Sequence, residues 1–232
     1  MRSIAIIPAR SGSKGVKDKN IIDLCGRPLV DYTIRAALDS ECFDTVMVST
    51  DSEEYADISR KCGAEVPFLR SKSTSSDTAG SWDVVREVLK KYLEQGETFD
   101  YVALLQPTSP LRSKDDIINA YNVLNRKNAN NVVSVTEVSH PVQWCFALDE
   151  TCSLSAFAQS PYSNMRRQEL KKHYQENGAI YLVDANKIMD SSYNLYADDC
   201  YAYIMLRTHS IDIDEEVDLI IAKAMIEKNL RS

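Results

Sequence analysis

Long apolar runs are missing from this sequence. No stretch approaches the roughly 20 apolar residues that a membrane-spanning helix requires, so no membrane partner is expected. The first four residues run directly into a strand-like segment, without the long apolar region and small-residue cleavage site of a signal peptide. We therefore expect a cytoplasmic protein.

Cysteine and histidine are present, but not at the spacings typical of redox or metal-binding motifs. The six cysteines include no C-x-x-C pair, and the three histidines show no metal-binding pairing. A disulfide framework and a zinc site are therefore not expected. A G-x-S-x-G motif is also lacking, so nothing supports a hydrolase with a serine nucleophile.

The charge balance is acidic, with a formal net charge of -7. Binding along a nucleic acid requires clustered cations over a broad face, so no nucleic-acid partner is expected. A local basic patch for a small anionic ligand remains compatible with this charge. The 232 residues, 44% of them hydrophobic, predict a single domain, residues 1–232, with a sizeable core.

Strand and helix signals alternate along the first two-thirds of the chain. The strand-like runs are apolar throughout, which is typical of a parallel sheet covered by helices on both faces. Strands are expected at 4–7, 45–49, 66–69, 101–105, 131–138, 179–183, 201–206 and 210–213. Helices are expected at 29–40, 52–62, 82–93 and 113–125. A final amphipathic helix is expected to carry on one face Val217, Ile220, Ile221, Ala224 and Met225.

Regular signals break down between about residues 140 and 176. This stretch mixes proline, cysteine and aromatic residues with a basic run, Arg166, Arg167, Lys171 and Lys172. The residues alone are compatible with a flexible insertion, with an arm that packs on a second subunit, or with a lid.

A cationic loop, residues 9–20, follows the first predicted strand. Its two glycines allow the backbone to turn and to point N–H groups inward as an anion nest. Its cations match phosphate oxygens, and they are Arg10, Lys14, Lys17 and Lys19. The loop is neither a Walker P-loop nor a dinucleotide fingerprint. The alternative interpretation is a solvated surface loop that binds nothing.

Two aspartates, Asp212 and Asp214, lie two residues apart near the end of the chain. On a strand they would share a face, and two carboxylates side by side favour a Mg²⁺ ion held together with phosphates. The alternative is that they belong to the acidic first turn of the final helix, where the helix dipole favours negative charge.

The segment 106–112 follows a predicted buried strand and contains two prolines. Proline fixes the backbone and removes donors, so this segment is expected to be a stiff, polar rim suited to base or sugar recognition. A plain strand-to-helix connection is the alternative. Because ligands of open α/β sheets bind beyond the carboxyl ends of the strands, the rim, residues 49–51 and the cationic loop should meet at one edge.

These motifs, in this order, resemble those of the acylneuraminate cytidylyltransferases, the CMP-sialic acid synthetases. The likeness spans essentially the whole chain, and it rests on Ile6-Ile7-Pro8-Ala9-Arg10-Ser11-Gly12-Ser13-Lys14-Gly15, Val48-Ser49-Thr50-Asp51-Ser52, Ser76-Asp77-Thr78-Ala79, Leu105-Gln106-Pro107-Thr108-Ser109-Pro110-Leu111-Arg112, Asn177-Gly178-Ala179-Ile180-Tyr181 and Ser210-Ile211-Asp212-Ile213-Asp214. The resemblance implies a Rossmann-like α/β nucleotide-diphospho-sugar transferase fold, with a mixed, mostly parallel sheet flanked by helices. It also implies a homodimer formed through the arm at about 140–176.

The resemblance further implies transfer of CMP from CTP to a nonulosonic acid, with release of pyrophosphate. Around the nucleotide it places Arg10, Ser13, Lys14, Lys19, Asn20, Arg70 and Asp77. It implies that Asp212 and Asp214 bind Mg²⁺ (or Mn²⁺). The catalytic residues that it implies are Lys19, Arg10, Asp212 and Asp214. Around the sugar it places Gln106, Ser109, Arg166, Arg167, Gln175 and Asn177. A nest of cations and N–H groups would stabilise the charge that develops on the departing pyrophosphate, while the acceptor of the hydroxyl proton stays open.

One departure from the family pattern concerns the sugar. Some members have an arginine shortly before the Asn-Gly-Ala-Ile-Tyr motif, whereas this chain has Gln175 and Glu176 there. Neither offers a bidentate cation to a carboxylate, and Arg166, Arg167 or Lys172 would have to compensate. N-acetylneuraminic acid is the first expectation, and legionaminic or another nonulosonic acid is the alternative. A transferase for another nucleotide and a non-catalytic nucleotide-binding homologue are the remaining rivals.

Overall fold

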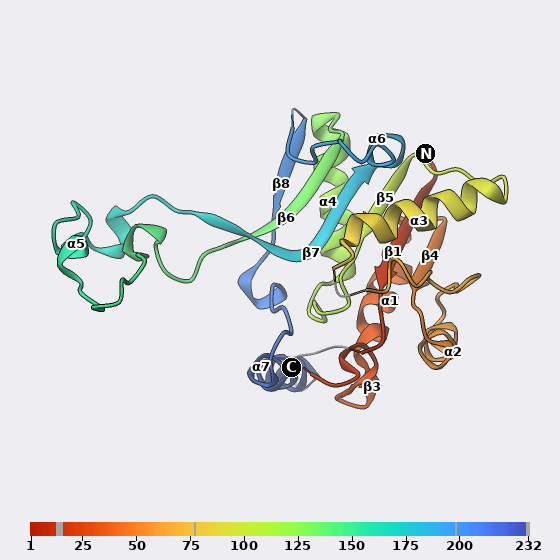
Figure 1. Cartoon of the computed structure of the whole chain (residues 1–232), viewed down its shortest axis with the longest axis horizontal. Coiled ribbons are helices and arrows are strands. Elements are labelled where there is room, and N and C mark those ends of the chain that lie inside the picture. Colours follow the sequence, from red (N-terminus) through yellow and green to blue (C-terminus); the bar gives the residue numbers. More distant parts are fainter. Residues whose placement is uncertain (13–15, 77, 198, 231–232) are drawn as a thin grey trace.

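The computed structural model describes residues 1–12, 16–76, 78–197 and 199–230. Its centre is a six-stranded sheet in the order β4-β1-β5-β7-β6-β8 (Figure 1). The strands are β1 (Ser3–Pro8), β4 (Thr45–Ser49), β5 (Tyr101–Leu104), β6 (Asn131–Glu137), β7 (Tyr174–Asp184) and β8 (Cys200–Ile204). A separate two-stranded ribbon pairs β2 (Asp23–Leu24) with β3 (Arg27–Pro28).

The sheet is mixed but mostly parallel. Strand β1 pairs in parallel with β4 and β5, and β6 pairs in parallel with β8. Only β7 among these strands runs against its neighbours, since it pairs antiparallel with both β5 and β6. The predicted Rossmann-like α/β class, with its mixed, mostly parallel sheet, is therefore confirmed.

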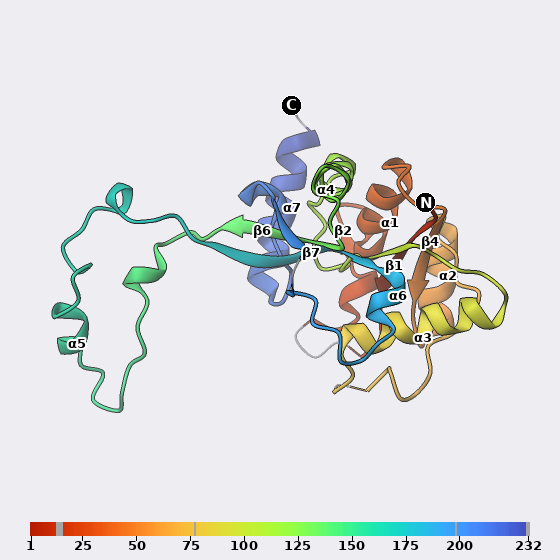
Figure 2. The same ribbon diagram turned by 90° about the horizontal axis from the view of Figure 1, so that it is seen from above.

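Helices cover the sheet on both faces. The covering helices are α1 (Leu29–Asp39), α2 (Glu53–Lys61), α3 (Ser81–Glu94), α4 (Lys114–Lys127) and α6 (Ala185–Ile188). The last helix, α7 (Glu216–Leu230), instead packs apart from the sheet, against Leu24 and Leu29. Figure 2 shows α1 and α4 on one side of the sheet and α3 and α6 on the other. Short helical turns complete the chain: η1 (Lys19–Ile21), η2 (Val142–Trp144), α5 (Ser155–Ala158), η3 (Arg167–Glu169) and η4 (Arg207–His209).

The apolar run of β1 explains this layering. Successive side chains of a strand point to opposite faces. Accordingly, Ala5 and Ile7 join the core beneath α1, α2 and α4, whereas Ile4 and Ile6 join the core beneath α3 and α6. All four side chains are fully buried. A strand buried on both faces has no polar alternation, which is the pattern that predicted the covered sheet.

Two helices that border the site begin at residues with the expected capping chemistry. Ser52 accepts a hydrogen bond from the N–H of Tyr55 at the start of α2. Ser113 and Asp116 form a reciprocal capping box at the start of α4. These caps satisfy backbone N–H groups that have no partner within the helix, and they fix where the preceding loops end.

Three predictions about elements are wrong. Residues 66–69 form no strand, because only a single bridge, between Glu65 and Met47, reaches the sheet there. Residues 210–213 are irregular rather than a strand. On α7, Leu219, Ala222 and Ile226 pack inward, and the face predicted from periodicity instead leaves exposed Val217, Ile220 and Ile221. The helix has apolar residues on both faces, so periodicity could not choose between them.

The segment between β6 and β7 leaves the body of the molecule as an extended arm. Figures 1 and 2 both show it projecting away from the sheet, with α5 near its far end. Strand β7 begins at Tyr174, within the stretch that was expected to be irregular up to 176. The arm exposes several large apolar side chains, Val142, Phe146, Leu148, Leu154 and Tyr162. In the described part of the chain, no helix has the length and apolar character needed to cross a membrane.

Candidate active site

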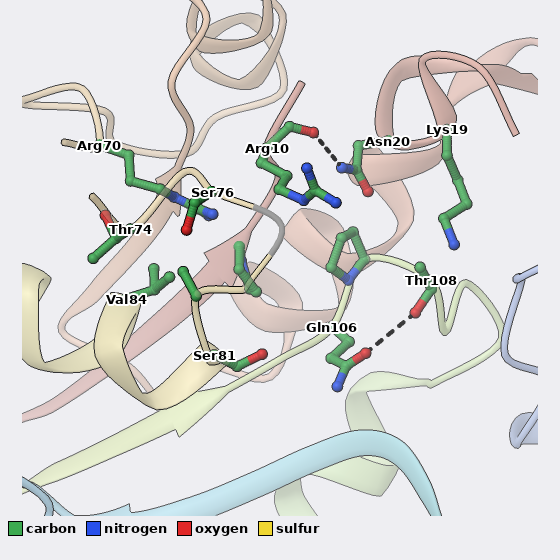
Figure 3. Close-up of a pocket in the computed structure, with 13 residues that line it drawn as sticks. Arg10, Lys19, Asn20, Arg70, Thr74, Ser76, Ser81, Val84, Gln106 and Thr108 are labelled. Atoms are coloured by element: carbon green, nitrogen blue, oxygen red, sulfur yellow. Dashed lines mark hydrogen bonds between the residues drawn. The ribbon is translucent and has the colours of Figure 1, made fainter. Parts of the chain in front are cut away.

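A polar pocket lies beyond the carboxyl ends of β1, β4 and β5, where the sheet rule placed it. Its volume is about 240 Å³. Three cations contribute to its wall from three separate segments: Arg10 after β1, Lys19 on η1, and Arg70 after α2. Figure 3 shows them around the opening, with Asn20, Gln106 and Thr108 on the same rim. The expected meeting of the cationic loop with the 106–110 rim is therefore present in the structure.

The cationic loop is tied to the start of α2 at two points. Asp51 accepts from the backbone N–H of Ser11 at 2.8 Å and from its hydroxyl at 3.0 Å. Further along, the hydroxyl of Tyr55 donates to Asp18 at 3.0 Å. Burial pushes the pKa of Asp51 upward, but the hydrogen bonds from Ser11 outweigh it and hold that pKa below its usual value. The loop is thus held by an ionised carboxylate, which argues against the interpretation of a free surface loop.

Asn20 and Arg70 are held from within the protein. The Asn20 amide donates to the carbonyl oxygen of Arg10 at 3.0 Å, so it fixes the backbone that carries this arginine. The Arg70 guanidinium donates to the carbonyl oxygen of Ser49 at 2.6 Å and to its hydroxyl at 3.2 Å. Burial lowers the pKa of Arg70 to about 10, and the group remains a cation at neutral pH. Both residues act at the pocket with their orientation set in advance.

The wall opposite the cationic loop is the serine- and threonine-rich segment 71–76, which Glu87 holds by hydrogen bonds. Glu87 accepts from the N–H and the hydroxyl of Ser71, each at 2.9 Å, and from the hydroxyl of Thr74. Lys91 forms an ion pair with it at 2.7 Å. Burial raises the pKa of Glu87, but these bonds together lower it to about 2. Glu87 could not be predicted from the sequence, because its partners lie 13 and 16 residues away, outside any local motif.

The two aspartates lie beside the pocket on an irregular segment. Ile213, between them, is fully buried, and its N–H donates to the carbonyl oxygen of Thr108 at 2.8 Å. Lys19 donates to the carbonyl oxygen of Ile213 at 2.7 Å and pairs with Asp214 at 3.2 Å. The reasoning from a strand face was wrong, but the segment is still attached to both the rim and the cationic loop. The acidic first turn of α7 consists of Glu216 and Asp218, so Asp212 and Asp214 are not part of it.

Asp212 could serve as a metal ligand. Its Oδ1 atom is buried and has no hydrogen-bond partner within the described part of the chain. Burial raises the pKa of Asp212; a hydrogen bond from Thr108 and the charge of Lys19 oppose this rise, and the charge of Asp214 adds to it. A divalent cation would satisfy both conditions, since it would neutralise the pair and occupy the unpartnered oxygen. The described residues contain no group of three or more potential protein ligands, so such an ion would need further oxygens from a ligand.

Gln106 lies beside Gly178 and is held by Arg112. Gly178 adopts a left-handed conformation with φ of +70°, and a Cβ atom there would lie 3.6 Å from the Gln106 side chain. The bare backbone of Gly178 leaves this space open beside the amide. Below it, Arg112 donates to the carbonyl oxygen of Gln106 at 3.2 Å. The stiff rim predicted from the two prolines is therefore also held from underneath.

Other predicted site residues have different surroundings. Asn177 is buried, and its amide is engaged with Ser134 and Ser210 at 2.6 and 2.9 Å. Ser109 is also buried, with a hydroxyl that has no partner among the described residues. Away from the pocket lie three predicted sugar contacts, Arg166 and Arg167 on the arm and Gln175 at its base. Outside the described residues lie Ser13, Lys14 and Asp77.

Fold and site together define a nucleotide-binding α/β protein, with a cationic pocket at the carboxyl edge of the parallel strands. The family model described as Cytidylyltransferase matches residues 4–218. The chain therefore belongs to the cytidylyltransferase family, whose members are nucleotidyltransferases. The family resemblance seen in the sequence is confirmed.

Three relatives span nearly all of this chain. It is 34% identical over 232 residues to pseudaminic acid cytidylyltransferase of Campylobacter jejuni, covering 100% of this chain and 99% of that protein. It is 38% identical over 231 residues to N-acylneuraminate cytidylyltransferase of Escherichia coli, covering 98% of this chain but 53% of that protein. It is 34% identical over 240 residues to CMP-N,N'-diacetyllegionaminic acid synthase of Legionella pneumophila, covering 99% and 98%.

Solved structures support the fold. The structure of CMP:2-keto-3-deoxy-manno-octonic acid synthetase complexed with CTP aligns with a TM-score of 0.73. The alignment covers 99% of this chain and 100% of that one, at 16% sequence identity. At this identity the likeness shows a common fold.

Proposed function

We propose that this protein transfers CMP from CTP to the anomeric hydroxyl of a nonulosonic acid and releases pyrophosphate. The observation that carries the proposal is the convergence of Arg10, Lys19 and Arg70 on one pocket of an otherwise acidic chain. Three cations from three segments match the negative charge of a triphosphate. Gln106 lines the same pocket and would orient the acceptor.

The catalytic contribution of these residues is electrostatic. When the acceptor hydroxyl attacks the α-phosphorus, the bond to the bridging oxygen breaks and negative charge develops on the departing pyrophosphate. Arg10 and Lys19 are held near that charge by a loop whose anchors, Asp51 and Asn20, are internal to the protein. Cations fixed before the reaction stabilise the transition state without reorganising during it.

The proposed site includes a divalent cation, Mg²⁺ or Mn²⁺, held by Asp212 and Asp214. When bound, the ion supplies charge neutralisation between the carboxylates and the phosphate oxygens. The unpartnered, buried Oδ1 atom of Asp212 supports this placement. The Thr108 carbonyl and the Lys19 ammonium hold the backbone of Ile213, and thereby set the spacing of the two carboxylates before any ligand arrives.

The acceptor is proposed at the level of the nonulosonic acid class, with N-acetylneuraminic acid as the first candidate. The three relatives are named for N-acylneuraminic, pseudaminic and diacetyllegionaminic acids, at identities of 38%, 34% and 34%. Identities this similar do not separate the three acids, and legionaminic and pseudaminic acids are therefore the alternatives. Gln175, where an arginine was expected from the family pattern, bears on this choice.

We also propose a homodimer in which the arm packs on a second copy. The arm exposes Phe146, Leu148 and Leu154 to solvent in the single chain, and exposed apolar surface of this extent favours association. A second subunit would cover these side chains. The arm projects away from the body of its own chain (Figure 2). In a dimer it would therefore bring Arg166 and Arg167, which lie on the arm, to the body of the second copy.

The test is a panel of nonulosonic acids assayed for pyrophosphate release with CTP and Mg²⁺. The proposal expects release with at least one acid, and the acid with the highest kcat/KM identifies the acceptor. A competition assay among CTP, UTP and ATP tests the nucleotide specificity, and CTP is expected to be the preferred substrate. CTP binding by calorimetry without turnover on any acid would point instead to a non-catalytic homologue.

A further inference from the structure

The predicted phosphate ligand Lys19 is already paired with a predicted metal ligand. Its side chain is only 14% exposed, and its ammonium group lies 3.2 Å from Oδ1 of Asp214. The same ammonium donates to the carbonyl oxygen of Ile213 at 2.7 Å. In Figure 3 the Lys19 side chain extends toward the Thr108 side of the pocket, away from Arg70. The Lys19 ammonium therefore lies against the acidic segment in this structure.

The carboxylate of Asp214 makes few other contacts among the described residues. Its side chain is 74% exposed, and Lys19 is its one ion-pair partner within the described part of the chain. Its backbone N–H is fixed separately, by Asp218 at 3.1 Å. The position of Asp214 is therefore set through the backbone, while its carboxylate can exchange one cationic partner for another without disturbing α7.

We propose that the Lys19 ammonium occupies the place of the divalent cation at Asp214 until nucleotide and metal arrive together. The inference rests on the proposed function of this site. Without ligands, the ammonium offsets the repulsion between Asp214 and Asp212, whose Oδ1 atom is buried without a described partner. Metal at the two carboxylates displaces the ammonium, which turns to the phosphates of the nucleotide. Each positive charge then meets the negative charge it matches, and no charge is left unpaired.

This exchange couples the two ligands. A divalent ion alone must break the Lys19–Asp214 pair and leave an ammonium group of low exposure without a carboxylate partner, which costs free energy. Nucleotide alone must draw Lys19 away and leave the charges of Asp212 and Asp214 without a cation between them. The complex of metal and nucleotide meets neither penalty. Metal and CTP are therefore expected to bind with positive cooperativity, a coupling that is reciprocal between the two ligands.

The test measures Mn²⁺ binding by the electron paramagnetic resonance signal of the free ion, which requires no turnover. In Lys19→Met, Mn²⁺ without nucleotide is expected to bind about tenfold more tightly than in the wild type, because a competing cation is gone. With CTP present, the same variant is expected to bind Mn²⁺ several-fold more weakly than the wild type. A reversal in the sign of the effect is the signature of the exchange.

Two further variants separate the possible causes. Lys223→Met removes one exposed positive charge from α7 and is expected to leave both Mn²⁺ affinities within about twofold of the wild type, because exposed charges are screened. In an Asp214→Asn background, Lys19→Met is expected to lose its gain in Mn²⁺ affinity. Circular dichroism confirms that each variant is folded.

The outcomes distinguish this inference from the proposed function. If wild-type protein with CTP binds no Mn²⁺, the proposed metal site itself is wrong. If wild type binds Mn²⁺ with CTP through Asp214, but Lys19→Met weakens Mn²⁺ binding or leaves it unchanged without nucleotide, the exchange is overturned and the proposed function stands.

Discussion

Arg112 donates a hydrogen bond from Nη1 to the carbonyl oxygen of Ala179 at 2.8 Å. Ala179 lies on β7, the antiparallel strand, and the same nitrogen reaches the carbonyl oxygen of Gln106 at the end of β5. Arg112 thus joins the two halves of the sheet directly below the proposed acceptor site. It is 2% exposed, and burial lowers its pKa to about 9. The described hydrogen bonds of this buried cation go to neutral oxygens, and the charge of Asp116 only partly offsets the cost of its burial. This cost indicates that the junction of β5 and β7 must keep its geometry.

Replacing Arg112 by methionine is expected to destabilise the protein by about 3 kcal/mol, because two buried carbonyl groups lose their donor. Urea unfolding measures the change. Arg126→Met, on the exposed face of α4, is the matched control and is expected to change stability by less than about 0.5 kcal/mol. Arg112→Lys keeps the charge and one donor and should lose less. Equal stability of Arg112→Met and the control would contradict the bracing role.

Glu87→Gln is expected to raise the KM for CTP more than it lowers kcat. The variant removes the ionised acceptor that holds Ser71 and Thr74, and Thr74 lines the pocket. Steady-state kinetics on the nucleotide measures the split. Glu54→Gln, on the exposed side of α2, should leave both constants unchanged. A fall in kcat at constant KM would contradict the positioning of this wall by Glu87.

The same carboxylate predicts a pH dependence of stability. The pKa of Glu87 is lowered from 4.5 to about 2, so the folded state favours its ionised form. The stabilisation is complete above the ordinary pKa and is lost as pH falls through the window between these values. Wild type should therefore lose more stability than Glu87→Gln between pH 4.5 and pH 2.5 when both are unfolded in urea. Parallel curves for the two proteins would show that Glu87 is not linked to folding.

His209→Ala is expected to raise the Mg²⁺ concentration for half-maximal turnover, because the segment that leads to Asp212 loses a tie to α4. His209 lies 2.8 Å from Asp116 and three residues before Asp212, so it holds the start of the proposed metal-binding segment. Tyr203→Phe removes a second bond to the same carboxylate, at 3.0 Å, from strand β8. That variant should lose stability without changing the Mg²⁺ requirement. An equal rise in the Mg²⁺ requirement of both variants would show that the effect comes from disturbing Asp116 and not from His209 itself.

Asp214→Asn is expected to raise the Mg²⁺ requirement while the melting temperature stays near that of the wild type. The side chain is largely exposed, so little packing is lost, but one of the two proposed metal ligands becomes neutral. A Mg²⁺ titration of turnover measures the change. Glu215→Gln, the next acidic residue and also exposed, should titrate like the wild type. An unchanged titration for Asp214→Asn would remove it from the metal site.

The sequence was most informative where local pattern and tertiary structure agree. The run from Ile4 to Ile7 is buried on both faces, so its uniform apolarity predicted a covered strand. The sheet rule then placed the cationic loop and the 106–110 rim together without any knowledge of contacts. No sequence pattern predicted that β7 is antiparallel, because a buried strand has the same apolar composition whichever way it runs.

The predictions that were wrong or missing also have physical causes. Residues 210–213 alternate polar and apolar side chains, as an edge strand does, but their segment bonds to Thr108 and Lys19 instead of to a sheet. The pairing of Glu87 with Ser71 joins separate elements, and it depends on how α3 packs. Distances of that kind are set by the whole fold, so motif spacing could not reveal them.

The central claim is tested most directly by measuring pyrophosphate together with the CMP-sugar in reactions that omit one component at a time. The account predicts equal amounts of both products only when CTP, a divalent cation and a nonulosonic acid are all present, and their loss in Lys19→Ala protein that remains folded. Pyrophosphate released without the acid, or no product with any acid of the panel, would contradict it.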